Sequence, residues 1–378
     1  MRGLTRIAPV VAALMMVFAS GAHAQGTARS MDFEQSIRIA GMGGAGGAVA
    51  WGERSAWGNP ATLGYSTGWG WEETRTQLVP GLADDIWIRT KRMTVGFGGV
   101  GVSWTGRPAG VGDVRLDYGM GGSYERVRGW GYGASLATLA DRFGHRDGAR
   151  SIARYGDLAF GQNFKEATVS LTPSPSGAAR ATNHDWGLLA RLSPSSLLRH
   201  GRDGVWDVDV AVGHSVMNAG DEKFVFVDED LAVSPTRLIR TGVAATGSLA
   251  QPTAMRMAFE RLPLLSALGP LVRVTVSRDA VHTDTKVNNK WEMDQWGAEF
   301  SFLGVVDLRY GHVDDPLGEI VDDTRGIGLC IPLGKVARVR WDYAEVPQAR
   351  DSGLPDVKRR SWSMWVDPAA IVRGRGGR

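Results

Sequence analysis

The stretch Val336-Ala-Arg-Val-Arg-Trp-Asp-Tyr343 alternates apolar and charged side chains with a period of two residues. Its two faces carry Val339, Trp341 and Tyr343 on one side, and Arg338, Arg340 and Asp342 on the other. Because successive side chains of a β-strand point to opposite sides, this pattern predicts a strand with one apolar and one charged face.

The same alternation recurs at 205–212, 271–277 and 305–310. The charged faces of these three stretches carry Asp207, Asp209, Arg273, Asp307 and Arg309. Such strands occur in soluble antiparallel sheets and in transmembrane barrels, and the two classes differ in whether the apolar face points to a core or to lipid. Periodicity alone leaves both classes open.

Two further observations favour a transmembrane barrel. Strand-like stretches of about 10 residues, the length that spans a bilayer when tilted, recur between Trp69 and Trp365. Tryptophans, which suit membrane interfaces, lie close to many predicted strand ends: Trp69, Trp71, Trp87, Trp104, Trp130, Trp186, Trp291, Trp296, Trp362 and Trp365. The alternative is a soluble exported β-rich protein whose tryptophans fill a core.

We therefore predict an all-β fold, a transmembrane antiparallel β-barrel of about 14 strands (range 12–16) within residues 65–368. In its first part, the pattern predicts strands at 85–91, 93–104, 114–126 and 130–139.

The N-terminus has the three parts of a secretory signal peptide in residues 1–24. Arg2 and Arg6 precede an apolar run at 7–19, and Ala22-His-Ala24 is a small-residue cleavage site. A transmembrane helix needs about 20 apolar residues, so removal of the signal is the better interpretation. We expect an exported protein of the bacterial outer membrane, in contact with outer-membrane lipid.

Composition excludes several other classes. Without Arg2 and Arg6, the 43 Lys and Arg residues become 41, against 40 Asp and Glu residues. Basic residues are scattered along the chain between acidic ones, so no nucleic-acid partner is predicted. Cys330 is the only cysteine, which excludes an internal disulfide framework and a multi-cysteine zinc site. No metal and no cofactor are predicted.

A glycine-rich block precedes the first predicted strand. It contains Gly41, Gly43, Gly44, Gly46 and Gly47, and is followed by Asn59-Pro60-Ala61. Glycine and alanine would let a segment threaded inside a barrel approach the wall closely, and Asn59-Pro60 favours a turn. We predict a plug at residues 25–64; a linker between signal and barrel is the alternative.

The order of signal, glycine block, Asn-Pro-Ala motif and strands resembles the N-terminal pattern of the PorV/PorQ outer-membrane proteins and their wider FadL-like relatives. The matching motif covers residues 39–63. The resemblance implies that this segment folds into or against a barrel of about 14 strands. One departure is that the chain continues past the last predicted strand into a basic tail at 369–378.

Two stretches match the sequence patterns of known catalytic or cofactor-binding motifs but lack the secondary structure that those motifs require. Gly41-x-Gly43-x-x-Gly46 lacks the preceding strand and following helix of a dinucleotide site. Gly64-Tyr-Ser66-Thr-Gly68 runs into a strand rather than the helix of a nucleophile elbow. We therefore predict no catalytic residues and no enzymatic activity.

The charged strand faces are predicted to line the lumen: Asp207, Asp209, Arg273, Asp307, Arg309, Arg338, Arg340 and Asp342. Opposite charges there would pair structurally, or mark a pathway for anionic solutes. Two functions remain open. The PorV/PorQ resemblance implies a barrel that engages secreted proteins in export or surface attachment, and the FadL resemblance implies a channel for hydrophobic or amphipathic small molecules.

Overall fold

The structure is a computed structural model that describes residues 29–31, 33–50, 56–106, 114–117, 123–143, 152–170, 177–199, 205–226, 232–262, 265–284, 290–316, 318–350 and 352–368. The predicted signal peptide at 1–24 and the basic tail at 369–378 lie outside these residues. Within them, nearly all of the chain after Gly68 forms antiparallel β-strands.

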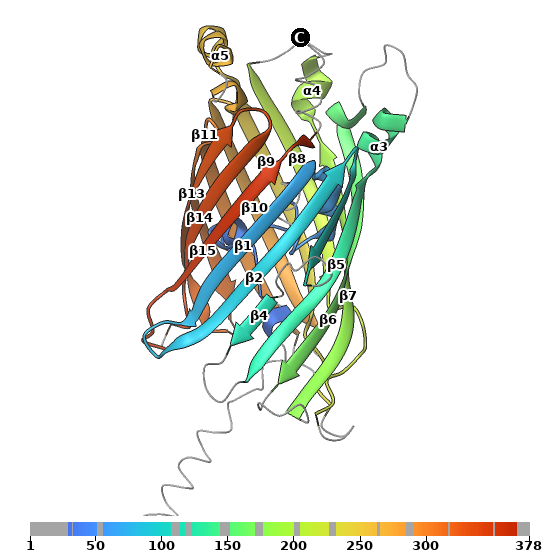
Figure 1. The fold of residues 1–378 in the computed structure, drawn as a ribbon, viewed down its shortest axis with the longest axis vertical. Coiled ribbons are helices and arrows are strands. Elements are labelled where there is room, and N and C mark those ends of the chain that lie inside the picture. Colours follow the sequence, from blue (N-terminus) through green and yellow to red (C-terminus); the bar gives the residue numbers. More distant parts are fainter. Residues whose placement is uncertain are drawn as a thin grey trace, which may run out of the picture.

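The strands are β1 (Gly68–Val79), β2 (Ala83–Phe97), β3 (Val100–Thr105), β4 (Val114–Asp117), β5 (Tyr124–Ser135), β6 (Gly156–Ser170), β7 (Ala178–Leu192), β8 (Trp206–Met217), β9 (Arg237–Leu249), β10 (Val272–Asp284), β11 (Lys290–Phe302), β12 (Val306–Asp315), β13 (Ile320–Leu333), β14 (Ala337–Val346) and β15 (Val357–Val366). They form one antiparallel sheet that closes where β1 pairs with β15 (Figure 1). Because β3 and β4 both pair with β2 and β5, they share one position in the wall. The barrel therefore has 14 strand positions, which confirms the predicted fold class.

The barrel is apolar outside and charged inside. Ile331, Leu308 and Val276 are 62%, 53% and 49% exposed, whereas Glu299 and Asp307 are each 1% exposed. A soluble barrel has the opposite arrangement, because its apolar side chains must leave water. This polarity is that of a barrel that spans a lipid bilayer.

Short helices lie at one end of the barrel. They are α3 (Leu136–Phe143), α4 (Pro194–Arg199) and α5 (Thr253–Glu260), and this end is called the helix end (Figure 1). The opposite end, which holds the turn between β1 and β2, is called the hairpin end. In the described part of the chain, every helix is too short or too polar to cross a membrane.

Four predicted strands between residues 85 and 139 have wrong boundaries. The stretches 85–91 and 93–104 are not separate strands, because β2 runs unbroken to Phe97 and the turn lies at Gly98-Gly99. Both glycines adopt positive φ, at 58° and 93°, a conformation that suits a tight turn. The stretches 114–126 and 130–139 also differ, since β4 ends at Asp117 and residues after Ser135 form α3.

One tryptophan does not lie at the membrane interface as predicted. Trp365 points into the barrel and is 7% exposed. A Cβ atom on Gly70 of the neighbouring strand would lie 2.1 Å from the Trp365 ring, so the missing side chain leaves the space that the indole occupies. Sequence periodicity does not reveal this space because it depends on the pairing of β1 with β15.

Candidate functional site: the plug and the side of the barrel

Residues 30–31, 33–50 and 56–66, called the plug, lie inside the barrel (Figure 1). The plug contains the one-turn helix α2 (Ile37–Ala40) and the 3₁₀ helix η5 (Pro60–Tyr65). Helix α2 contacts β13, β14 and β15, while η5 contacts β3, β5, β6 and β7 across the barrel. The plug therefore reaches opposite walls, and most of its side chains are buried.

Polar side chains of the wall hold the backbone of the glycine block. Thr324 Oγ1 accepts from Gly43 N at 2.8 Å, Asp279 Oδ2 accepts from Gly47 N at 2.7 Å, Ser277 Oγ donates to Ala45 O at 2.7 Å, and Arg240 Nη1 donates to Gly44 O at 2.9 Å. These bonds satisfy backbone groups that no regular secondary structure pairs. The backbone of the block is thus fixed by hydrogen bonds from the wall, and Ala48 and Val49 add apolar contacts.

The glycines of the block are required by space and by conformation. Gly43 and Gly44 have φ values of 67° and 85°, which favour glycine. A Cβ on Gly43 would lie 2.5 Å from His312 O, and one on Gly41 would lie 3.1 Å from the Cα of Gly326. Gly46 packs against Ile39 in the same way, and Gly47 against the Arg240 side chain.

Asn59 joins three parts of the site. Its Oδ1 accepts from Ala61 N at 3.1 Å and so caps η5, which begins at Pro60. Its Nδ2 donates to Gly47 O at 2.7 Å and to Leu188 O at 3.1 Å. Asn59 therefore connects η5, the glycine block and β7 although its side chain is fully buried.

Replacing Asn59 by alanine is expected to lower the free energy of unfolding by about 2–3 kcal/mol, because a cap and two buried hydrogen bonds are lost. Asn59→Ser is the matched control: it keeps a capping oxygen but cannot reach both carbonyls, so we expect an intermediate loss. Urea unfolding of the folded barrel measures both. Equal stability of the alanine variant and the wild type would contradict the role assigned to Asn59.

The wall facing η5 is a continuous row of glycines. Gly96, Gly101, Gly133, Gly161 and Gly187 lie directly opposite one another on β2, β3, β5, β6 and β7. A Cβ on each would lie between 2.1 and 2.9 Å from a plug atom. The row extends with interruptions through Gly213 on β8, Gly297 on β11 and Gly311 on β12, which meet the glycine block. At the level of the plug, the wall is therefore smooth, in the sense that these glycines present backbone and no side chains to the plug.

A layer of buried charges joins the plug to the wall near α2. Glu299 on β11 accepts from Arg38 Nε at 2.6 Å and from Arg309 Nε at 2.8 Å. Arg309 also contacts Asp342 at 2.7 Å, and Arg340 binds Asp342 through Nε at 2.7 Å and also pairs with Asp307. The layer contains three arginines and three carboxylates, and Arg273 on β10 interacts electrostatically with Glu299 and Asp307.

The structure brings four of the predicted lumen-lining residues into this layer: Asp307, Arg309, Arg340 and Asp342. The other four lie on the inner face nearer the strand ends that lead to the helix end: Asp207, Asp209, Arg273 and Arg338. Asp207 accepts a hydrogen bond from Ser195, and Arg338 lies over the Trp365 ring at 5.6 Å. Sequence analysis missed Arg38 and Glu299, although Glu299 has the alternating pattern of a lumenal residue.

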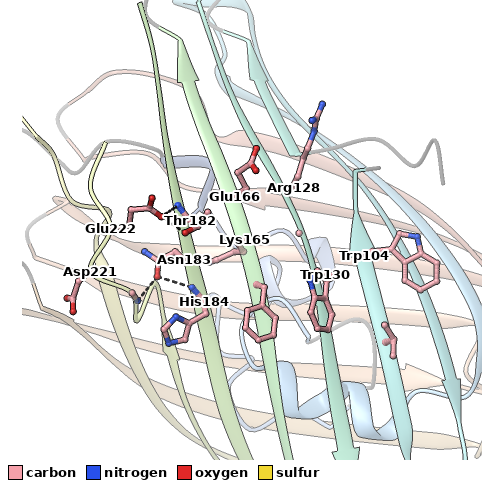
Figure 2. A pocket seen from close by; sticks show the side chains of 14 residues that line it. Trp104, Arg128, Trp130, Lys165, Glu166, Thr182, Asn183, His184, Asp221 and Glu222 are labelled. Carbon is pink, nitrogen blue, oxygen red and sulfur yellow. Dashed lines mark hydrogen bonds between the residues drawn. The ribbon is translucent and has the colours of Figure 1, made fainter. Parts of the chain in front are cut away.

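A groove of about 870 Å³ lies on the outside of the wall beside β3, β5, β6 and β7. Figure 2 shows Trp104 and Trp130 on neighbouring strands, Arg128 farther along the strand of Trp130, and Glu166 and Glu222 on the strands and segment beyond it. Trp130 stacks on Phe164 with ring centroids 4.8 Å apart. The groove thus has an aromatic part and a polar part.

A second cavity lies between this groove and the plug. It is lined by Ala56 and Trp57 of the plug and by Trp104, Trp130 and Phe164, which also line the groove. Among the described residues, β3 ends beside this cavity at Thr105, and β4 begins at Val114. The volume is about 20 Å³, the room of a single water molecule. No solute of larger size fits unless the plug or wall moves.

Segment 218–222 covers the edge of β7 beside the groove. Residues 186–192 of β7 pair with β8, whereas 178–185 do not. Ala219 N donates to His184 O at 2.8 Å, and Gly220 N donates to Asn183 Oδ1 (Figure 2). The Glu222 carboxylate accepts from the Thr182 hydroxyl and amide, and these bonds hold the pKa of Glu222 below its usual value.

Because this pKa is lowered in the folded state, the contact stabilises the covering segment above the ordinary carboxyl pKa and is lost as pH falls through the lowered value. We expect amide exchange at Thr182, corrected for its intrinsic pH dependence, to become faster only on acidification. In Glu222→Gln the exchange should vary much less with pH over this range. A wild-type profile identical to that of Glu222→Gln would contradict the assignment.

No protein-family model matches this sequence, and no curated protein matches it. The fold resembles that of a Pseudomonas aeruginosa FadL homologue, at 10% identity and a TM-score of 0.42 over 88% of this chain and 98% of that chain. It also resembles the Pseudomonas putida toluene transporter TodX (10% identity, TM-score 0.37, 86% and 96% covered). The fold also resembles CdiB from Acinetobacter baumannii, at 9% identity and a TM-score of 0.40 over 79% of this chain and 60% of that chain. These identities and TM-scores are too low to indicate what this chain binds. The PorV/PorQ resemblance stays a prediction.

Proposed function

We propose that this chain is a non-enzymatic outer-membrane barrel whose plug controls the passage of a hydrophobic or amphipathic small molecule. The observation that carries the proposal is the cavity in the side of the barrel that lies between buried Trp57 and the outward-facing Trp104 and Trp130. An apolar solute would enter from the membrane along these rings, since aromatic side chains line hydrophobic ligand sites.

The contacts of the plug agree with such a role. The row of glycines on the facing wall presents no side chains to η5, so this part of the plug can shift without displacing wall side chains. The buried pair of Arg38 with Glu299 and the apolar contact of Ala40 with Ala344 hold the part near α2 to the opposite wall. The cavity beside Trp57 would open when the plug shifts away from β3 and β5.

Ser103→Phe tests the path, because Ser103 lies on the inner face of β3 and lines this cavity. Ser363→Phe is the matched control: it also faces inward, but lines a cavity of about 10 Å³ beside Trp365. With the barrel in vesicles, we expect Ser103→Phe to reduce uptake of a fluorescent fatty acid about tenfold or more, since a buried ring leaves no passage. Ser363→Phe should retain uptake. Equal uptake by both variants, or none by the wild type, would contradict the proposal.

A second candidate is the PorV/PorQ-type role, in which the barrel engages secreted proteins for export or surface attachment. The observation that favours it is the edge of β7 at 178–185, beside the groove, which β8 does not pair and which segment 218–222 covers instead. An extended segment of a partner would bind such an edge through backbone hydrogen bonds. Absence of uptake by the wild type, together with crosslinking of a secreted protein to Arg180 replaced by a photoreactive residue, would favour this candidate.

A further inference from the structure

Five neighbouring strands place an arginine at the same height on the outside of the barrel. Arg360 on β15 lies opposite Arg75 on β1, which lies opposite Arg89 on β2. Arg89 lies opposite Arg115 on β4, which in turn lies opposite Arg126 on β5. Figure 1 shows these strands side by side. We call these five residues the arginine row.

The side chains of the row face outward. Arg75, Arg89, Arg115 and Arg360 are exposed, and Arg126 is half-buried. Beyond β5, Thr168 on β6 lies between Arg126 and Arg180 on β7, so a sixth arginine continues the line. Residues between 75 and 360 in the sequence are thus brought into one band, which explains why the basic residues look scattered along the chain.

Such a row is unfavourable without an anion. Like charges directly opposite each other on paired strands repel and destabilise the sheet. Glu73 compensates in part, at 3.8 Å from both Arg89 and Lys91. Arg75 lies over the Trp87 ring at 4.0 Å, a contact that orients the guanidinium but does not neutralise it. The row therefore gathers five guanidiniums at one height of the outer surface, where an anion that contacts several of them would lower their mutual repulsion.

The opposite wall pairs basic side chains with acidic ones. On β10 and β11, Arg278 pairs with Asp294 and His282 lies 3.4 Å from Glu292. On β12 and β13, His312 lies 2.8 Å from Asp323. In these described pairs a basic side chain lies beside a carboxylate of the neighbouring strand, whereas in the row arginine lies opposite arginine.

The row lies just beyond the apolar band. Trp362 is two residues from Arg360, and Trp130 is four residues from Arg126, both toward the helix end. At about 3.3 Å per residue, the guanidiniums lie roughly 7–13 Å along the strand from these rings. Tryptophans mark the interface of the hydrocarbon, so the row lies at the depth of lipid headgroups.

We propose that the arginine row binds the phosphorylated headgroups of an anionic lipid in the leaflet around the hairpin end. Arginine suits this ligand because its planar guanidinium can donate two parallel hydrogen bonds to two oxygens of one phosphate. A lipid with several phosphates spans more than one strand and so neutralises adjacent arginines. This site lies outside the barrel and does not depend on the proposed passage of a small molecule.

Native mass spectrometry of the folded barrel in uncharged detergent tests the site. The probes are a diglucosamine lipid with two phosphates, the same lipid without phosphates, and inorganic phosphate. The row variant is Arg75→Gln/Arg89→Gln/Arg360→Gln. The control carries the same charge change elsewhere, as Arg256→Gln/Arg278→Gln/Arg325→Gln. Retention of the heat-dependent shift in electrophoretic mobility shows that each variant is folded.

We expect the row variant to bind the phosphorylated lipid about 100-fold more weakly than the wild type, from roughly a fivefold contribution per arginine. The control should keep wild-type affinity, and the dephosphorylated lipid should bind all three proteins alike. Equal affinity of the row variant and the control would overturn the proposal. So would tight binding of inorganic phosphate with no preference for the phosphorylated lipid, which would assign the row to free anions.

Discussion

Gly213→Val is expected to displace the glycine block from the wall and to leave strand β8 intact. A Cβ at this position would lie 2.0 Å from Gly47 O and 2.9 Å from the Cα of Ala48, and both atoms belong to the plug backbone. Because neither can move without breaking the bond from Gly47 N to Asp279, the plug must shift. Such overpacking costs about 3 kcal/mol, and hydrogen exchange at 41–49 should become about 100-fold faster.

Gly247→Val is the matched control on the neighbouring strand β9. A Cβ there would meet nothing within 4 Å, and valine favours strands. We therefore expect wild-type exchange at 41–49 in this variant. If Gly213→Val also kept wild-type protection from amide exchange at 41–49, the absence of side chains at the wall glycines would not be what lets the plug bind there.

Glu299→Leu is expected to lower the free energy of unfolding by about 3–5 kcal/mol, because it removes the carboxylate that Arg38 and Arg309 share in a buried layer. The effect should also appear as faster amide exchange in α2, since Arg38 is the plug residue that this layer holds. Urea unfolding followed by tryptophan fluorescence gives the first quantity, and exchange gives the second.

Asp294→Leu provides the comparison on the same strand. Asp294 pairs with Arg278 on the outside of the barrel, where the two side chains are 42% and 68% exposed. An exposed ion pair contributes about 0–1 kcal/mol, so this variant should unfold close to the wild type. Equal losses in Glu299→Leu and Asp294→Leu would contradict a special role for the buried layer.

The alternation of single strands predicted much of the fold, because it reports local geometry. It placed Arg340 and Asp342 on one face of β14, and Asp307 and Arg309 on one face of β12, where the structure has them on the inside. Strand ends were less predictable. The break at Gly98-Gly99 depends on two positive φ values, which the sequence permits but does not require.

What the sequence could not show is lateral register. Each glycine of the wall is a single residue in its own strand, and only the pairing of β5 with β6 and β7 aligns Gly133, Gly161 and Gly187. The arginine row arises in the same way from residues far apart in the chain. Arg38 was missed because its role depends on where the plug places α2 against β11 rather than on a local pattern.

The central claim, that the plug must move for a solute to pass, is tested most directly by tethering it. Ala40 of α2 and Ala344 of β14 belong to one buried apolar cluster. Paired cysteines at these positions, with Cys330→Ala to remove the native thiol, would fix the plug to the wall when oxidised. The measurement is uptake of a fluorescent fatty acid into vesicles containing the folded barrel, before and after reduction. We predict little uptake in the oxidised state and wild-type uptake after reduction. Equal uptake in both states, with the disulfide verified by mass spectrometry, would contradict the account.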